Sequence, residues 1–142
     1  MRRVARTYQW GKEMPLIRID SIAGRSPEQV KQLLDAAHRA ILSAFLVPER
    51  DRYQIYQEHA AEHFIVQDTG LGIPRSSQVI VVTVISRPRS REAKQQFYAE
   101  LCRELKDSCG MEASDVMVSI VTNTDADWSF GNGHAQFLTG EL

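Results

Sequence analysis

Hydrophobic residues recur along this chain with the spacings that predict strands and helices. Residues 16–20 alternate between apolar and polar, and residues 79–86 are almost entirely apolar; each segment predicts a strand, the second one buried on both faces. After Ser26, and again after Ser90, apolar residues fall three and four apart, which predicts two amphipathic helices with serine at the N-cap. We expect Gly110 to end the second helix. Shorter strands are predicted at residues 53–57, 64–67 and 116–121.

The same order of elements occurs twice, 64 residues apart. A shift of 64 places Ser26 on Ser90 and the apolar positions of the first helix on those of the second. Two such βαβ units predict an α+β fold, with a four-stranded mixed sheet and both helices on one face. The other sheet face would stay exposed unless chains associate. Aromatic residues on both sides of Gly131-Asn132-Gly133 add a C-terminal hairpin to the prediction.

Length, composition and charge favour one globular domain. The chain has 142 residues, of which 43% are hydrophobic and 25% charged, and its formal net charge is −1. A nearly neutral chain argues against a nucleic-acid clamp and a polybasic membrane binder, and the longest apolar stretch is too short to span a bilayer. Cys102 and Cys109 lie seven residues apart on the second predicted helix, beyond disulfide reach. We therefore expect reduced thiols and a cytoplasmic location.

The first 14 residues differ from the rest in charge. Three arginines and one lysine against one glutamate give this segment a net charge of +3, and it lacks the apolar core of a secretory signal. We expect either a disordered extension or a start codon placed upstream of the natural one, followed by a folded domain over residues 15–142. If translation began at Met14 and the methionine were removed, Pro15 would carry a secondary amine. Such an amine can accept a proton, donate one or add to a carbonyl.

The sharpest polar feature is Arg87-Pro88-Arg89, directly after the 79–86 strand. In extended backbone, residues two apart point the same way, so the two guanidinium groups would converge and could take a carboxylate in forked geometry. The start of the next helix favours an anion at the same place. A solvated basic loop is the alternative reading.

Several other polar or aromatic positions have a structural reading beside a functional one. His59-Ala60-Ala61-Glu62-His63 matches an inverted zinc-protease motif, but it lies between two predicted strands rather than on a helix, so we expect no metal. Asp51 could be a turn or cap residue. Trp128, Phe130 and Phe137 could line a pocket or pack in the core.

Taken together, these residues resemble the tautomerase superfamily, and within it the malonate semialdehyde decarboxylases most closely. The resemblance covers residues 15–142 and rests on MPLIRIDSIAGRS, VPERDRYQ, QDTGLG, SRPRS and DWSFGNGHAQFLTGEL. It implies a repeated βαβ fold, an N-terminal catalytic proline and assembly as a homotrimer. It also implies that neither a cofactor nor a metal takes part, and that the partners are a small carboxylate substrate and further copies of the chain, not nucleic acid or membrane.

The resemblance further implies a set of site residues and a reaction. The catalytic positions are matched by Pro15, Asp51, Arg87 and Arg89, and the substrate pocket by Trp128, Phe130, Phe137 and Leu142. The implied reaction is decarboxylation of a 3-oxo acid, malonate semialdehyde, to acetaldehyde and CO2. One alternative is a promiscuous keto–enol tautomerase or hydratase that uses the same proline. Another is a catalytically silent oligomeric homologue, because the extension would bury the proline nitrogen in a peptide bond.

Overall fold

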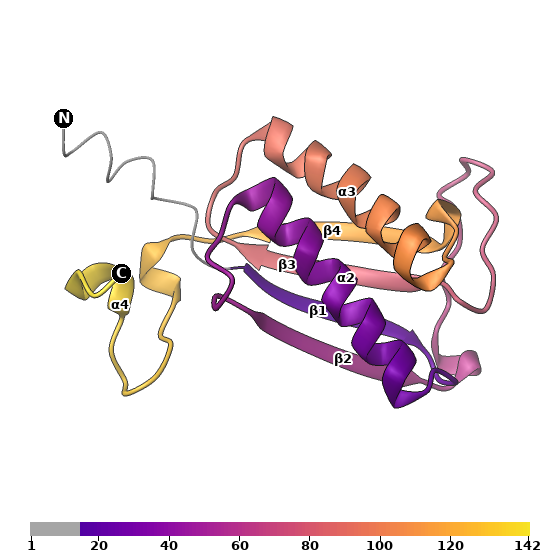
Figure 1. Ribbon diagram of the computed structural model, residues 1–142, viewed down its shortest axis with the longest axis horizontal. Helices are drawn as coiled ribbons and strands as arrows, with labels where there is room; N and C mark the ends of the chain where they lie inside the picture. The colour runs from indigo at the N-terminus through magenta and orange to yellow at the C-terminus, as the bar shows by residue number, and fades with distance from the viewer. Residues whose placement is uncertain (1–14) are drawn as a thin grey trace.

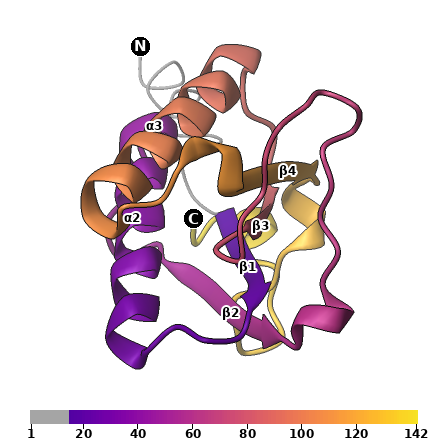
Figure 2. The same ribbon diagram turned by 90° about the vertical axis from the view of Figure 1, so that its right-hand side faces the viewer.

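A four-stranded mixed sheet carries two long helices across one face (Figures 1 and 2). The computed structural model describes residues 15–142, so the predicted extension over residues 1–14 lies outside the described residues. The main elements are β1 (Pro15–Ile22), α2 (Pro27–Phe45), β2 (Tyr53–His59), β3 (Ile80–Ser86), α3 (Arg91–Cys109) and β4 (Val116–Thr122). The strand order is β2-β1-β3-β4; the central pair is antiparallel and the outer pairs are parallel. The predicted α+β architecture is confirmed.

The predicted repeat is present as two strand–helix–strand units. Helix α3 begins and ends 64 residues after α2. Both helices begin after the predicted serine: Ser26 Oγ accepts a hydrogen bond from the backbone N–H of Gln29, and Ser90 Oγ accepts one from that of Ala93. Gly110 ends α3 in the left-handed region, with φ of 66°, where glycine is favoured.

The hydrophobic core lies between the sheet and the two helices. Ile17 and Ile19 of β1 and Val82 and Val84 of β3 are buried against it, and the Phe97 ring of α3 lies 5.3 Å from the Phe45 ring of α2, centroid to centroid. Burial along β3 alternates, with every second residue only partly covered. The prediction that β3 is buried on both faces is therefore wrong for the single chain, because helices cover one face only.

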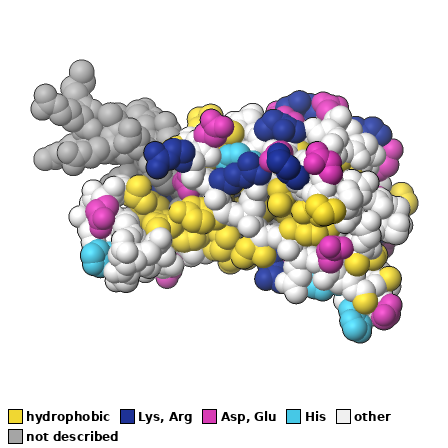
Figure 3. Space-filling model, turned by 60° about the horizontal axis from the view of Figure 1, so that its bottom comes forward, with side chains coloured by type: hydrophobic (Ala, Val, Ile, Leu, Met, Phe, Trp, Pro, Cys, Tyr) yellow, Lys and Arg dark blue, Asp and Glu magenta, His cyan; other side chains and the backbone are white. Residues whose placement is uncertain are grey.

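The other face of the sheet leaves large hydrophobic side chains exposed on its outer strands. These side chains are 43–50% exposed and belong to Tyr53, Ile55, Met117 and Val121. Figure 3, which brings the bottom of the Figure 1 view forward, shows hydrophobic side chains gathered in a band along that side of the molecule. Exposed hydrophobic surface of this kind is typical of a contact with another protein.

Two predicted β segments are absent or reduced. The predicted hairpin is wrong beyond one bridge between Gly131 and His134, after which the chain forms the short helix α4 (Gln136–Thr139). The reason is that the Gln136 side chain takes the place of a partner strand: its Oε1 accepts from the N–H of Phe130 at 2.9 Å and its Nε2 donates to the carbonyl of Gly131 at 2.9 Å.

Residues 64–67 do not form the predicted strand. The chain passes instead through a 3-10 turn, η1 (Ala61–His63), and then an irregular loop in which the Ile65 side chain is 80% exposed. The Asp68 carboxylate accepts the N–H groups of Gly70 and Gly72, which closes a turn in this loop. Residues 68–72 thus make these hydrogen bonds within the loop, and farther along Ser76 donates from its N–H and hydroxyl to the Asp115 carboxylate.

Two observations concern the cysteines and the membrane. Cys102 and Cys109 are both free and both lie on α3, as predicted, and burial raises the pKa of each thiol. Among the helices described for residues 15–142, none has the length and hydropathy needed to cross a bilayer.

Candidate active site

The sheet register brings the predicted catalytic residues to one end of the sheet, where β1 and β2 begin and β3 ends. Pro15, at the start of β1, pairs with Ser86, the last residue of β3, and Leu16 pairs with Tyr53, the first residue of β2. Because β4 runs parallel to β3 and ends at the same level, the segment that follows β4 leaves the sheet at this end too (Figure 1). The Pro15 side is therefore surrounded by the residues before β2, after β3 and after β4.

Arg87 is held between a carboxylate and an aromatic ring. Its side chain is only 5% exposed. Its Nη1 donates to Oδ1 of Asp125 at 2.9 Å, and its Cζ lies 3.7 Å from the centroid of the Phe137 ring. Asp125 belongs to the 3-10 turn η3 (Asp125–Asp127) and Phe137 to α4, so both contacts come from the segment after β4. Planar stacking together with an ion pair suits a guanidinium and not an ammonium.

Arg89 contacts the end of helix α2 instead. Its Nε donates to Ser86 Oγ at 3.0 Å, its Nη1 to the carbonyl of Phe45 at 3.4 Å, and its Cζ lies 4.8 Å from the centroid of the Phe45 ring. Ser86 Oγ in turn donates to the carbonyl of Arg87 at 2.8 Å. The fully buried Ser86 thus links the backbone of one arginine to the side chain of the other.

Asp51 lies in a turn that is fastened to α2. The N–H of Asp51 donates to the carbonyl of Pro48 at 3.0 Å, and Nε2 of the buried His38 lies 3.0 Å from the carbonyl oxygen of Glu49. On the other side, Arg52 Nη2 donates to Asp35 Oδ1 at 2.7 Å. The carboxylate of Asp51 is therefore carried on backbone held at both ends.

The Asp35 anchor makes a testable prediction about stability. Hydrogen bonds from Lys31 and Arg52 lower the pKa of Asp35 from 3.8 to about 2. Because the folded-state pKa is the lower one, this carboxylate stabilises the fold above pH 3.8, and the contribution is lost as the pH falls through about 2. We expect Asp35→Asn to lower the free energy of unfolding at pH 7 by at most about 1 kcal/mol. Urea unfolding of both proteins from pH 7 to pH 3 should show this difference shrinking below about pH 4; an unchanged difference contradicts the assignment.

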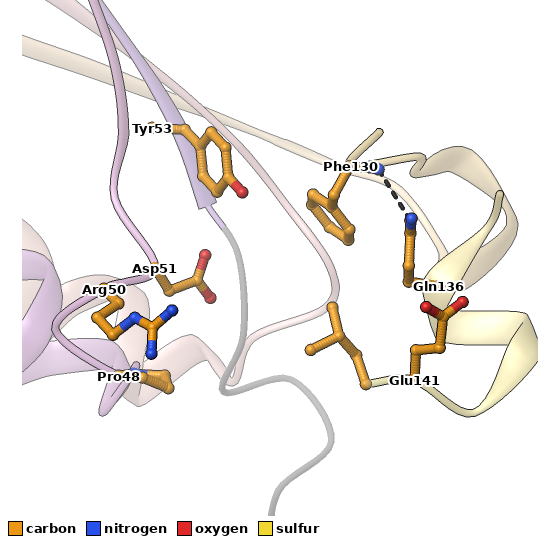
Figure 4. Close-up of a pocket in the computed structure, with 8 residues that line it drawn as sticks. Pro48, Arg50, Asp51, Tyr53, Phe130, Gln136 and Glu141 are labelled. Atoms are coloured by element: carbon orange, nitrogen blue, oxygen red, sulfur yellow. Dashed lines mark hydrogen bonds between the residues drawn. The ribbon is translucent and has the colours of Figure 1, made fainter. Parts of the chain in front are cut away.

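A pocket of about 490 Å³ opens beside Asp51 (Figure 4). Residues 48–53 form one wall, from which the Asp51 carboxylate and the Tyr53 hydroxyl point inward, and the C-terminal segment forms the other wall. The full lining is Pro48, Arg50, Asp51, Tyr53, Phe130, Gln136, Glu141 and Leu142.

Aromatic rings connect this pocket to Arg87. The Phe130 ring lies 6.0 Å from that of Tyr53, stacks on Trp128 at 5.7 Å and meets the edge of Phe137 at 5.3 Å, all between centroids. Trp128 Nε1 donates to Asn123 Oδ1 at 2.7 Å, which fixes that ring beside the end of β4. Of the predicted pocket residues, Phe130 and Leu142 line this pocket, whereas Trp128 and Phe137 flank Phe130.

Comparison with known proteins identifies the family. Two models described as tautomerase enzyme match residues 15–72 and 51–131, which together span the four strands. The chain is 51% identical over 129 residues to the probable tautomerase YrdN of Bacillus subtilis strain 168, covering 91% of this chain and 100% of that protein. The chain belongs to the tautomerase family.

Solved structures place this tautomerase-family enzyme near the decarboxylases of the superfamily. A crystal structure of malonate semialdehyde decarboxylase has a TM-score of 0.88 at 52% identity, covering 89% of this chain and 98% of that one. A symmetric trimer of a fused 4-OT has a TM-score of 0.72 at 25% identity, covering 88% of this chain and 98% of the other. A probable tautomerase and a decarboxylase among the relatives indicate an isomerase or lyase, and both solved structures confirm the predicted fold.

The zinc-protease motif does not form a metal site in the described part of the chain. His59 ends β2 and His63 lies in η1, so the two do not share a helical face. His59 Nε2 lies 2.6 Å from Asp20 Oδ1, and its ring stacks on Phe64. Residues 15–142 contain no cluster of three or more histidine, cysteine, aspartate or glutamate side chains able to hold a metal ion.

Several residues around the site were not predicted from the sequence. Arg50, Tyr53, Gln136 and Glu141 line the pocket, and Asp125 pairs with Arg87. The neighbourhood of Asp51 in the sequence could have indicated the first two. The other three come after β4 in an irregular segment, where no periodic pattern says which side chains turn back toward the sheet.

Proposed function

We propose that this enzyme decarboxylates a 3-oxo acid, converting malonate semialdehyde to acetaldehyde and CO2. The observation that carries the proposal is the position of Pro15 at the start of β1, across from Ser86 and thus beside the segment that holds Arg87 and Arg89. In this proposal Pro15 is the N-terminal residue of the working protein. Support comes from the 52% identical decarboxylase, whose structures include a variant with its first residue, a proline, replaced by alanine. One family model also begins its match at residue 15.

Decarboxylation needs an electron sink for the pair of electrons that the breaking carbon–carbon bond releases. When the bond between the carboxylate carbon and C2 breaks, its electron pair moves to C2 and on to the aldehyde oxygen, giving an enolate. Protonated Pro15 donates to that oxygen, or its charge stabilises the oxygen, and a proton then reaches C2 to give acetaldehyde. An iminium between Pro15 and the aldehyde carbon is a second route to the same sink.

The two arginines hold the carboxylate in this proposal. Charge-assisted hydrogen bonds from guanidinium groups turn the breaking bond perpendicular to the carbonyl plane, so that its electrons enter the π system. The aromatic rings of Trp128, Phe130 and Phe137 make the surroundings apolar, which favours departure of neutral CO2 over retention of the anion.

A direct assay tests the proposal. Purified enzyme is incubated with malonate semialdehyde, acetaldehyde is followed by its reduction with alcohol dehydrogenase and NADH, and released CO2 is measured in parallel. We expect equal amounts of the two products. Loss of substrate without CO2 would overturn the decarboxylase proposal.

Replacement of Asp51 should change the pH dependence. The carboxylate of Asp51 raises the pKa of the Pro15 amine, whereas two guanidinium charges lower it. Asp51→Asn removes only the first influence, so we expect a lower amine pKa and loss of activity at a lower pH than in wild type. NMR titration of protein with a ¹⁵N-labelled N-terminal proline measures this pKa directly. An identical titration curve in the variant would refute the role given to Asp51.

A second candidate is a tautomerase or hydratase that uses the same proline. The 51% identical relative is named a probable tautomerase, and the decarboxylase relative is described as having hydratase activity as well. Tautomerisation needs neutral Pro15 as a base, whereas decarboxylation uses the cation. An assay of phenylpyruvate enol ketonisation, run beside the decarboxylase assay across pH, ranks the two activities.

We also propose that the chain assembles as a homotrimer. The exposed hydrophobic side chains on the open sheet face support this, as does the trimeric fused 4-OT relative. Sedimentation equilibrium should give three times the 16.1 kDa mass of one chain. A single-chain mass at micromolar concentration contradicts the proposal.

A further inference from the structure

The 3-10 turn η3 supplies a carboxylate to the most buried arginine of the site. Asp125 Oδ1 lies 2.9 Å from Arg87 Nη1, and the two side chains are 50% and 5% exposed. A guanidinium so far removed from water requires a compensating negative charge or polar contacts. Asp125 provides that charge from a segment outside the βαβ repeat, while the Phe137 ring covers the face of the same guanidinium.

The pair affects both the orientation and the charge that a bound carboxylate meets. A fixed hydrogen bond at Nη1 restricts rotation of the guanidinium plane about the side chain, so the fork keeps one direction. At the same time, the negative charge of Asp125 repels a second carboxylate bound to Arg87. At a separation of roughly 6 Å and an effective dielectric constant of about 20, that repulsion would weaken anion binding roughly a hundredfold. Because the Asp125 side chain is 50% exposed, water and salt screen its charge, and we expect an effect of about tenfold.

We propose that Asp125 is a positioning residue, which orients Arg87 for the substrate carboxylate and at the same time weakens its hold on that carboxylate. This rests on the proposed role of Arg87 in binding the substrate. Asp125 thereby lowers the affinity for the bound substrate but fixes the orientation of the bond that breaks. The carboxylate product of any competing reaction, or a carboxylate that cannot react, would also leave more readily.

The test uses malonate, a dicarboxylate without an aldehyde, as an equilibrium probe of the full chain and of the form that begins at Pro15. Asp125→Asn keeps the shape and an acceptor oxygen but removes the charge. We expect the dissociation constant of malonate, measured by calorimetry, to fall about tenfold, while kcat for decarboxylation also falls about tenfold. Asp125→Glu keeps the charge but displaces it, so it should leave malonate affinity within about threefold and still lower kcat.

Asp127→Asn is the matched control. Asp127 lies on the same 3-10 turn, but its carboxylate is exposed and accepts hydrogen bonds from the N–H and hydroxyl of Thr124. We expect malonate affinity and kcat within about twofold of wild type, because exposed charges are screened. Calorimetric stoichiometry counts the folded sites, so partial unfolding cannot imitate a tighter dissociation constant.

The outcomes separate this inference from the proposed function. Unchanged or weaker malonate binding by Asp125→Asn overturns the role of Asp125, whatever the enzyme decarboxylates. Tighter binding in that variant, with a wild-type protein that releases no CO2 from malonate semialdehyde, supports the role of Asp125 and refutes the decarboxylase. A wild-type protein that neither binds malonate nor releases CO2 refutes both.

Discussion

A chain that begins at Pro15 should release CO2 from malonate semialdehyde about a thousandfold faster than a chain in which residue 15 stays in a peptide bond. The reason is the chemistry of one nitrogen atom. In a peptide bond it has no useful basicity, so it can neither hold a proton for the aldehyde oxygen nor form an iminium. As the terminal secondary amine that we propose to act with Arg87, Arg89 and Asp51, it could do both.

Two expressed forms make this comparison. One chain starts at Met14, so that removal of the methionine leaves Pro15 first; the other is the full chain with Met14→Leu, which blocks internal initiation. Intact-mass measurement identifies the N-terminal residue of each preparation, and circular dichroism shows whether both fold alike. The processed chain with Pro15→Ala, which keeps a primary amine, should retain only a small part of the activity. Equal activity of the full Met14→Leu chain and the processed chain would remove Pro15 from the mechanism.

Elements that depend on neighbouring residues could be predicted from the sequence. Ser26 and Ser90 cap their helices because the cap hydrogen bond reaches only three residues along the chain. The apolar stripe of each helix has the 3.6-residue period that burial on a sheet requires. Repetition of these local signals was enough to predict the four strands of the main sheet and the single face on which both helices lie.

The error at the C-terminus has a different origin. The turn at Gly131-Asn132-Gly133 exists, but a hairpin also needs a second strand, and local turn residues do not determine the conformation of the next segment. Here the Gln136 side chain occupies the backbone groups that a partner strand would use. Side-chain competition of this kind leaves no periodic signal in a sequence.

The candidate site was predicted in two steps. Position after a strand indicated Arg87 and Arg89, and the resemblance to the tautomerase superfamily placed Pro15 in the same site. The pairing of Pro15 with Ser86 puts the start of the Arg87–Arg89 segment at the Pro15 end of the sheet. The partners of the arginines were not predictable. Asp125 lies 38 residues from Arg87, and Phe45 lies 44 residues from Arg89, so both contacts depend on tertiary packing. The two guanidinium groups, which we expected to converge, therefore contact different partners: that of Arg87 contacts Asp125, and that of Arg89 contacts the end of α2.

The second large effect that we expect is a loss of catalytic activity in Arg89→Ala. Arg89 lies at the edge of the site, with Ser86 Oγ and the carbonyl of Phe45 fixing its guanidinium. Its removal takes away a charge and a direction at once, so we expect kcat/KM for malonate semialdehyde to fall about a thousandfold. Arg89→Lys restores the charge without the fork and should recover no more than about a tenth of the lost activity.

The effect of Arg89→Ala on catalysis can be separated from its effect on stability. Arg89→Ala also loses a cation–π contact with Phe45 and a hydrogen bond at the C-terminal end of α2, which together should cost about 1–2 kcal/mol of unfolding free energy. After this loss the variant should still be almost entirely folded, and urea unfolding measures the folded fraction. Arg91→Ala is the matched control, because Arg91 carries the same charge two residues away and is exposed at the first position of α3. Its kcat/KM should stay within about twofold of wild type. Full turnover by folded Arg89→Ala would show that the substrate carboxylate is held elsewhere, because no folded site could lose its orienting cation and keep its rate.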